Sequence, residues 1–130
     1  MAREVRIRKA VLERMKEEAR RSPALECCGL LAGRDDVITE IFPAANVLSS
    51  ATEFEIAPTE LFRIFRAMRE AGLAHLGIYH SHPRGPEVPS ARDVEQAFYP
   101  EAAYFVLSPK GVRAFGIRNG LAEEMEIKIE

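Results

Sequence analysis

The pattern of apolar and polar residues along the chain predicts a succession of helices and strands. Two segments have apolar side chains at helical spacing and charged residues on the other side, about Lys9 to Arg21 and Pro58 to Gly72. Pro23 follows the first and ends it, because a proline ring prevents the helix from continuing. In the second, Thr59 is expected to cap the N-terminus and Gly72 to end the helix. A third, shorter helix is expected from Ser90 to about Phe98.

Short apolar or alternating segments between these helices predict strands. The expected strands are Val5 to Ile7, Cys27 to Ala32, Val37 to Phe42, Thr52 to Ile56, Leu73 to His80, Ala102 to Leu107, Val112 to Ile117 and Leu121 to Ile129. The last two are joined by Asn119-Gly120, a pair typical of a β-hairpin. Strands predominate over helices, so we expect an α+β (mixed α/β) fold, with a mixed, mostly antiparallel β-sheet flanked by helices.

The length and composition are typical of one globular domain. The chain has 130 residues, of which 47% are hydrophobic and 29% charged, so residues 1–130 are expected to form a single domain. A formal net charge of −2 gives no support for nucleic-acid binding. No apolar run approaches the roughly 20 residues of a membrane span, and no apolar signal-peptide core follows Met1-Ala2. We therefore expect a cytoplasmic protein without membrane contact.

The two cysteines, Cys27 and Cys28, are neighbours in the sequence. Two lone thiols fit a reducing compartment and exclude a disulfide scaffold. We interpret them as small buried residues of a strand, where successive side chains point to opposite faces, so that at most one of them faces any site on that strand.

Two histidines and an aspartate follow one another closely near the middle of the chain. His80 and His82 stand two residues apart at the end of an expected strand, so both side chains point the same way. Asp93 lies on the following helix and can reach back toward them. Two imidazoles and one carboxylate leave the fourth tetrahedral position of a zinc ion for water, which is the arrangement of a catalytic site. An H-x-H pair by itself is more often two partly satisfied histidines than a metal site.

Two further residues have an ordinary interpretation beside a catalytic one. Ser90 and Asp93 match a helix-capping pattern, which is compatible with Asp93 also facing a metal. Glu26 immediately precedes a buried strand, where an unpaired carboxylate is costly, and this makes it a candidate general base. The alternative is an ordinary glutamate at a strand edge in contact with solvent.

Taken together, these residues resemble the signature of the JAMM (MPN+) metalloprotease family. The matching positions are Glu26, then His80-Ser81-His82, then Ser90 after seven residues and Asp93 after two more. The segment from Glu26 to Gly33 is also similar to the opening block of the family's small prokaryotic members. The resemblance covers nearly the whole chain. It implies a cytidine-deaminase-like architecture in which His80, His82 and Asp93 hold Zn²⁺.

The resemblance also implies an activity. The expected reaction is zinc-dependent hydrolysis of a peptide or isopeptide bond after the C-terminal Gly-Gly tail of a ubiquitin-like or sulfur-carrier protein. Zinc would lower the pKa of its water toward about 7, with Glu26 as general acid/base and Ser90 assisting the oxyanion. We expect the extended tail to add to an exposed strand edge beside the site, where glycines let its backbone lie flat. The alternative is a non-catalytic MPN-type scaffold for protein interaction.

Other side chains receive simpler interpretations. His75 is expected to pack or to form a hydrogen bond behind the site, and Tyr79 to lie in the core on the face opposite the histidines. The spaced row Arg63, Arg66 and Arg69 is read as a solvated helix face, with docking of an acidic partner as the alternative. A homodimer through this second helix is the oligomer considered.

Overall fold

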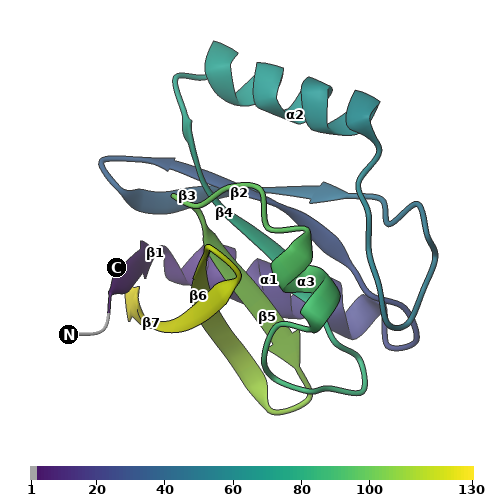
Figure 1. Cartoon of the computed structure of the whole chain (residues 1–130). Helices are drawn as coiled ribbons and strands as arrows, with labels where there is room; N and C mark the ends of the chain where they lie inside the picture. Colours follow the sequence, from purple (N-terminus) through teal and green to yellow (C-terminus); the bar gives the residue numbers. More distant parts are fainter. Residues whose placement is uncertain (1–2) are drawn as a thin grey trace.

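Seven strands and three helices make up the computed structural model, which describes residues 3–130 (Figure 1). In chain order they are β1 (Glu4–Ile7), α1 (Lys9–Arg21), β2 (Cys28–Arg34), β3 (Val37–Ala44), α2 (Pro58–Glu70), β4 (Ala74–Ser81), α3 (Ala91–Glu95), β5 (Ala103–Ser108), β6 (Gly111–Arg118) and β7 (Leu121–Ile129). Four of the seven strand pairings are antiparallel and three are parallel. The predicted mixed α/β class is therefore confirmed.

The strands form a closed ring in the order β1-β3-β2-β4-β5-β6-β7. Closure depends on β1, which pairs in parallel with β3 on one side and with β7 on the other. The pattern of strands along the sequence predicted a sheet and not a ring. Among the described residues, β1 covers β3 only at Val37 and Ile38, so the rest of β3 has no strand partner on that side. The expected addition of a substrate tail to an exposed edge stays a prediction.

Two hydrophobic clusters fill the two sides of the strands. Helix α1 places Leu12 and Met15 in one cluster, together with Phe105 from β5. Helix α2 places Ile64 and Met68 in the other. Figure 1 shows the two helices well apart, with the strands between them. The strands therefore form a rigid layer that is buried on both sides, and the functional side chains project from its end.

The segment from Thr52 to Ile56 was predicted to be a strand and is a loop. Its backbone hydrogen bonds go to nearby loop residues, chiefly the Asn46 side chain, instead of a neighbouring strand. The amide of Asn46 donates to the Glu53 carbonyl and accepts from the Glu55 N–H, and the Val47 N–H donates to the Glu55 carbonyl. An asparagine that satisfies local backbone groups in this way competes with strand pairing.

The predicted cap of the second helix was also wrong. Ala57, not Thr59, is the residue before the first helical turn, and it makes no side-chain capping hydrogen bond. Pro58 occupies the first helical position, where a missing N–H costs nothing because that group has no partner inside a helix. The third helix is shorter than expected and ends at Glu95.

Within residues 3–130, none of the helices has the length and apolar character that a membrane crossing requires. The expectation about a signal peptide rests partly on Met1 and Ala2, which lie outside the described residues. That residues 1–130 form one domain stays a prediction.

Candidate metal centre

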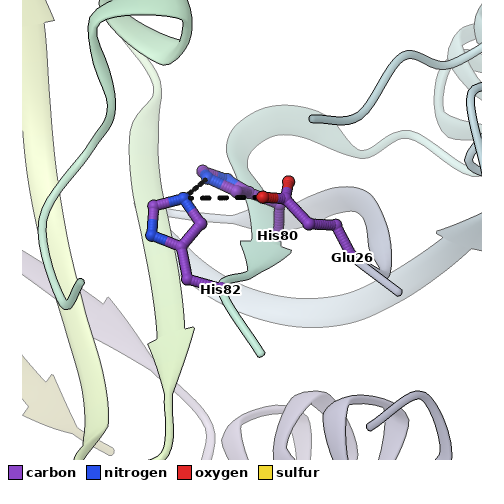
Figure 2. Close-up of side chains that lie close together, drawn as sticks. All are labelled: Glu26, His80 and His82. Atoms are coloured by element: carbon purple, nitrogen blue, oxygen red, sulfur yellow. Dashed lines mark hydrogen bonds and ion pairs between the residues drawn. The ribbon is translucent and has the colours of Figure 1, made fainter. Parts of the chain in front are cut away.

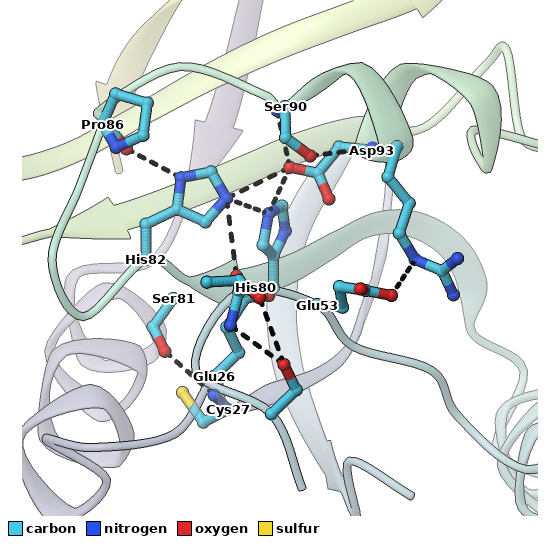
Figure 3. Close-up of polar contacts among 12 residues, drawn as sticks. Glu26, Cys27, Glu53, His80, Ser81, His82, Pro86, Ser90 and Asp93 are labelled. Carbon is cyan, nitrogen blue, oxygen red and sulfur yellow. Dashed lines mark hydrogen bonds and ion pairs between the residues drawn. The ribbon is translucent and has the colours of Figure 1, made fainter. Parts of the chain in front are cut away.

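His80, His82 and Asp93 meet at the end of β4. The two Nε2 atoms of the histidines lie 3.0 Å apart, and Asp93 Oδ2 lies 3.0 Å from His80 Nε2 and 3.1 Å from His82 Nε2 (Figure 3). The three side chains are almost completely buried. The structure thus brings together, in one triangle of donor atoms, the three residues predicted as metal ligands.

Strand geometry accounts for the direction of both histidines. His80 stacks on Phe54 at 4.6 Å between ring centroids, while its neighbour Tyr79 is fully buried in the opposite cluster. The His82 N–H donates to the Leu107 carbonyl at 2.7 Å, which continues the alignment of β4 with β5 for one more residue. The two-residue period of a strand therefore places both imidazoles on one side, as the H-x-H spacing predicted.

Asp93 is held in place by the first turn of α3. The Asp93 N–H donates to Ser90 Oγ at 3.0 Å, and the Ser90 N–H donates to Asp93 Oδ2 at 2.8 Å. These reciprocal bonds form a capping box, which fixes both residues at the start of a helix only five residues long. Asp93 therefore both caps the helix and faces the two histidines.

Glu26 lies beside this triangle, just before β2. Its side chain is 2% exposed, Oε2 is 3.9 Å from His82 Nε2, and Oε1 has no hydrogen-bond partner among the described residues (Figure 2). The backbone of the same residue is fixed on both sides, since its N–H donates to the Ser50 carbonyl and its carbonyl accepts from Asn46. Burial raises the pKa of Glu26 to about 7, with His82 opposing this and Asp93 adding to it. A carboxyl group with such a pKa can both take and give a proton near neutrality.

The charges within the triangle favour an ionised aspartate. Burial opposes ionisation of Asp93, but its contacts with the two imidazoles outweigh this and hold its pKa well below the usual range. Burial lowers the pKa of His80. Burial also acts to lower the pKa of His82, but the Asp93 carboxylate and the Pro86 carbonyl raise it overall.

The donor set fits a divalent cation such as zinc. Ligand atoms about 2.0–2.1 Å from a tetrahedral ion lie about 3.3 Å from one another, close to the 3.0–3.1 Å separations here. His82 Nδ1 is 2.7 Å from the Pro86 carbonyl oxygen, which can only accept, so Nδ1 holds the proton and Nε2 is free to ligate. The buried Nδ1 of His80 and Oε1 of Glu26 have no partner among the described residues.

A second set of donors overlaps the first. Ligand atoms of Glu26, His80 and His82 all lie within 4.8 Å of one another, which would also suit a metal ion. The set containing Asp93 is tighter, and Glu26 stands farther out. Asp93 therefore fits the third ligand position more closely, and the Glu26 carboxyl stands beside that position.

Three contacts around the centre had no signal in the sequence. Ser81 Oγ accepts from the Cys27 N–H at 2.9 Å and ties the start of β2 to the end of β4. Arg92 Nε, on α3, is 3.2 Å from Glu53 Oε2 on the preceding loop. The stacking of Phe54 on His80 is the third. All three depend on segments far apart along the chain.

The residues predicted to be structural are structural. Cys27 and Cys28 point into opposite clusters, and burial raises the pKa of both thiols. His75 Nε2 contacts the Gly77 carbonyl at 2.9 Å, and its ring packs edge-on against Phe65. Neither the thiols nor His75 reaches the triangle of donors.

Comparison with known proteins places the chain among peptidases. Residues 8–118 match the family described as prokaryotic homologs of the JAB domain. A desampylase of Haloferax volcanii is 38% identical over 107 residues, which cover 80% of this chain and 77% of the relative. A probable TtuB-protein conjugate cleaving protease of Thermus thermophilus is 36% identical over 113 residues, covering 86% and 75%. A CysO-cysteine peptidase of Mycobacterium tuberculosis is 31% identical over 130 residues, covering 95% and 89%.

Solved structures show the same fold. The solution structure of a protein from Desulfitobacterium hafniense matches with a TM-score of 0.86 at 32% identity, covering 97% of this chain and 92% of that one. A JAB1/MPN domain protein from Archaeoglobus fulgidus matches with a TM-score of 0.64 at 21% identity, covering 97% and 100%. At that lower identity the likeness concerns the fold alone.

Proposed function

The chain belongs to the family of prokaryotic homologs of the JAB domain, and from that premise we propose that it is a zinc-dependent peptidase or isopeptidase of the JAMM type. The observation that supports this most directly is the triangle of His80, His82 and Asp93 donor atoms beside the buried carboxyl of Glu26. The names of the three relatives are those of conjugate-cleaving enzymes or peptidases.

In this proposal each residue has one task. His80, His82 and Asp93 would hold the metal, and a bound zinc ion would supply Lewis-acid chemistry that makes water more acidic. Glu26, with a pKa of about 7, takes a proton from the attacking water and returns it to the leaving amine. Ser90 Oγ already accepts from the Asp93 N–H, so its hydroxyl hydrogen is available to the oxyanion that develops on the scissile carbonyl.

The proposed substrate is a ubiquitin-like or sulfur-carrier protein that ends in Gly-Gly. The relatives' names, which include conjugate cleavage and a CysO-cysteine peptidase, support this class. A pocket of about 130 Å³ borders His80 and Asp93 and is lined largely by apolar side chains. So small a space suits an extended backbone without bulky side chains, which is the property of two consecutive glycines.

Incubation with tailed proteins tests this proposal. Zinc-loaded protein is mixed with fusions in which a ubiquitin-like or sulfur-carrier protein precedes a short peptide, and the products are identified by mass. We expect release directly after the second glycine, loss of release with a chelator, and recovery on adding zinc. Cleavage that continues unchanged in the chelator, or after replacement of both glycines by alanine, would contradict the proposal.

The second candidate is the non-catalytic scaffold. It would be supported by zinc-loaded protein that binds tailed proteins and leaves all of them intact. The buried and convergent donor set argues against it, because a scaffold has no use for an unpaired carboxyl at such a site.

Location and assembly are proposals of the same kind. We place the protein in the cytoplasm, in keeping with two unpaired thiols.

We also propose a homodimer through α2. It is supported by Phe62, which is 69% exposed on that helix. Sedimentation of Phe62→Ser beside the unchanged protein tests it.

A further inference from the structure

A second and larger hollow borders the candidate metal centre on its His82 side. It has a volume of about 480 Å³ and is walled by the end of α1, the segment Ser81–Pro83 and the turn between β5 and β6. This volume lies within the usual range of about 300–1,000 Å³ for ligand sites, and it exceeds what one amino acid fills. We call it the cationic groove because basic side chains line it.

Three basic side chains line the cationic groove, Lys16 and Arg20 from α1 and Lys110 from the β5–β6 turn, and no residue lining it has a carboxylate. Lys16 has one exposed partner, Glu13, at 3.8 Å. Arg20 and Lys110 form no ion pair with any residue of the described range 3–130. The chain as a whole has a net charge of −2, so this concentration of positive charge is local.

The two hollows share no lining residue and differ in chemistry. The small pocket borders His80 and Asp93 and is mostly apolar, whereas the cationic groove borders His82. A bond cleaved at the triangle has an acyl side and an amine side, and the two sides need separate space. Glu26 Oε2 stands 3.9 Å from His82 Nε2, so the group that protonates the departing amine is close to the His82 side. The amine side therefore belongs to the cationic groove.

We propose that the cationic groove binds an acidic peptide segment that flanks the lysine from which the tail is released. This inference rests on the proposed function and extends it, because it assigns selectivity for the modified protein rather than for the tail. Charge complementarity selects the occupant: three lysine and arginine side chains without competing carboxylates attract aspartate and glutamate side chains. The three contacts are exposed and weak one by one, so we expect a preference of about five- to tenfold.

Three substrates that differ only in flanking charge test the proposal. Each joins the same Gly-Gly tail through an isopeptide bond to a lysine peptide, with glutamates, serines or arginines on both sides of the lysine. We expect kcat/KM to be highest for the glutamate peptide and lowest for the arginine peptide. The difference should shrink as salt is added, because exposed charges are screened within about 10 Å at 0.1 M ionic strength.

Charge-reversal variants locate the effect. Lys110→Glu, in a turn, and Arg20→Glu, in α1, should each abolish or invert the order of kcat/KM between the glutamate and arginine peptides. Arg69→Glu is the matched control: it makes the same change in net charge on the exposed last turn of α2, away from the groove, and should keep the preference. Thermal unfolding of each variant establishes that it is folded. If one groove variant does not fold, the other still tests the proposal.

A binding measurement makes the result independent of turnover. The glutamate peptide with a free lysine, which is the amine product, is titrated into the unchanged protein and followed by NMR. Shifts confined to residues 16–23, 81–83 and 107–112 support the proposal. If all three substrates are cleaved equally and the peptide does not bind, the groove proposal is wrong while the proposed function stands. If none is cleaved but the peptide binds, the proposed function is wrong, and the groove binds an acidic peptide without any role in cleavage. Binding of an RNA oligonucleotide at these residues, without binding of the peptide, would also overturn the groove proposal.

Discussion

Glu26 holds its carboxyl group in a place where burial costs free energy. One of its oxygens is buried and unpaired among the described residues, and burial raises its pKa to about 7. If this residue served stability alone, its carboxyl group would accept hydrogen bonds or be exposed to solvent. Perturbed carboxyl groups in a cluster of titratable side chains are typical of catalytic acids and bases.

Replacement of Glu26 by glutamine tests this role at the residue itself. Glu26→Gln preserves shape but cannot exchange a proton, so we expect zinc content to stay at about one ion per chain. Cleavage of a Gly-Gly-tailed substrate should fall by about 10²- to 10⁴-fold, the usual contribution of a positioned acid or base. Metal analysis and initial rates on the same sample provide both readouts. Full activity in the variant would remove Glu26 from the mechanism.

Substitution of a proposed ligand should lower the zinc content, in contrast to substitution of Glu26. His80→Ala and Asp93→Ala each remove one donor from the triangle, so both should lower the zinc content measured after purification and dialysis. His75→Ala is the matched control, because His75 lies on the same strand but contacts the Gly77 carbonyl and Phe65 instead of the triangle. Unchanged zinc content in His80→Ala would assign the ligands elsewhere.

His75 gives a pH dependence that is separate from the metal. Burial lowers its pKa from the ordinary value of 6.5, against the opposing hydrogen bond to the Gly77 carbonyl. The unfolded chain therefore binds this proton more readily than the folded one, and protonation favours unfolding. Its contribution to stability is complete above pH 6.5 and is lost as the pH falls from there through the folded pKa.

The test compares the metal-free protein with His75→Gln, which does not titrate, in the same chelating buffer. Between about pH 7.5 and about pH 5, the free energy of unfolding should fall more steeply for the unchanged protein than for the variant. Groups common to both chains cancel in this comparison. Parallel curves would show that His75 does not contribute the predicted dependence.

At the scale of elements, α3 is too short to be stable by itself and depends on its cap. The five-residue helix begins with the reciprocal bonds between Ser90 and Asp93. Isolated helices of this length do not persist in water, so the position of Asp93 follows from the capping box and from packing. Ser90 thus caps α3 and, in the proposed mechanism, also donates a hydrogen bond to the oxyanion.

Two substitutions separate these tasks of Ser90. Ser90→Asp provides a capping oxygen but no hydroxyl donor, and Ser90→Ala provides neither. We expect Ser90→Ala to lower the free energy of unfolding by about 1 kcal/mol and Ser90→Asp to recover most of that loss. Both should cleave at least about tenfold more slowly, because each lacks the hydroxyl. Recovery of cleavage together with stability in Ser90→Asp would mean that capping is the whole role.

The elements that could be predicted from the sequence are those specified by their own residues. Apolar periodicity placed α1 and α2, and alternation placed His80 and His82 on one side of β4. The segment from Thr52 to Ile56 was mistaken for a strand because its apolar and polar residues alternate, while its hydrogen bonds are decided by Asn46. The pattern of residues within one segment does not indicate hydrogen bonds to a side chain outside that segment.

At the scale of the molecule, the closed ring could not be predicted for a related reason. Closure requires β1 to lie between β3 and β7, with Glu4 opposite Glu126 near the other end of the chain. Strand patterns specify which face of a strand is buried but not which strand lies next to it. The donors of the site were easier to predict, because His80, His82 and Asp93 follow each other within one strand-loop-helix unit. Glu26 was only a weak candidate from its position before a buried strand, and the resemblance to a family singled it out.

The folded positions of the donors predict that metal binding stabilises the whole molecule. The donors come from the end of β4 and the start of α3, and the unfolded chain does not hold these together. An ion that binds only the folded state adds about 2.7 kcal/mol to the free energy of unfolding at 100 times its Kd, which for this size raises Tm by about 10 °C. Zinc should produce this rise in the unchanged protein, and a chelator should reverse it.

The variants then show which residues bind the ion. Glu26→Gln should keep the rise in Tm, and Asp93→Ala should lose most of it, because the tight triangle contains Asp93 and excludes Glu26. Each variant is compared with its own metal-free form, so any direct effect of the substitution on folding cancels. The opposite outcome, a rise kept by Asp93→Ala and lost by Glu26→Gln, would transfer the third ligand to Glu26, whose donor atom also lies within 4.8 Å of those of the histidines. A general base would then have to be sought elsewhere in the site.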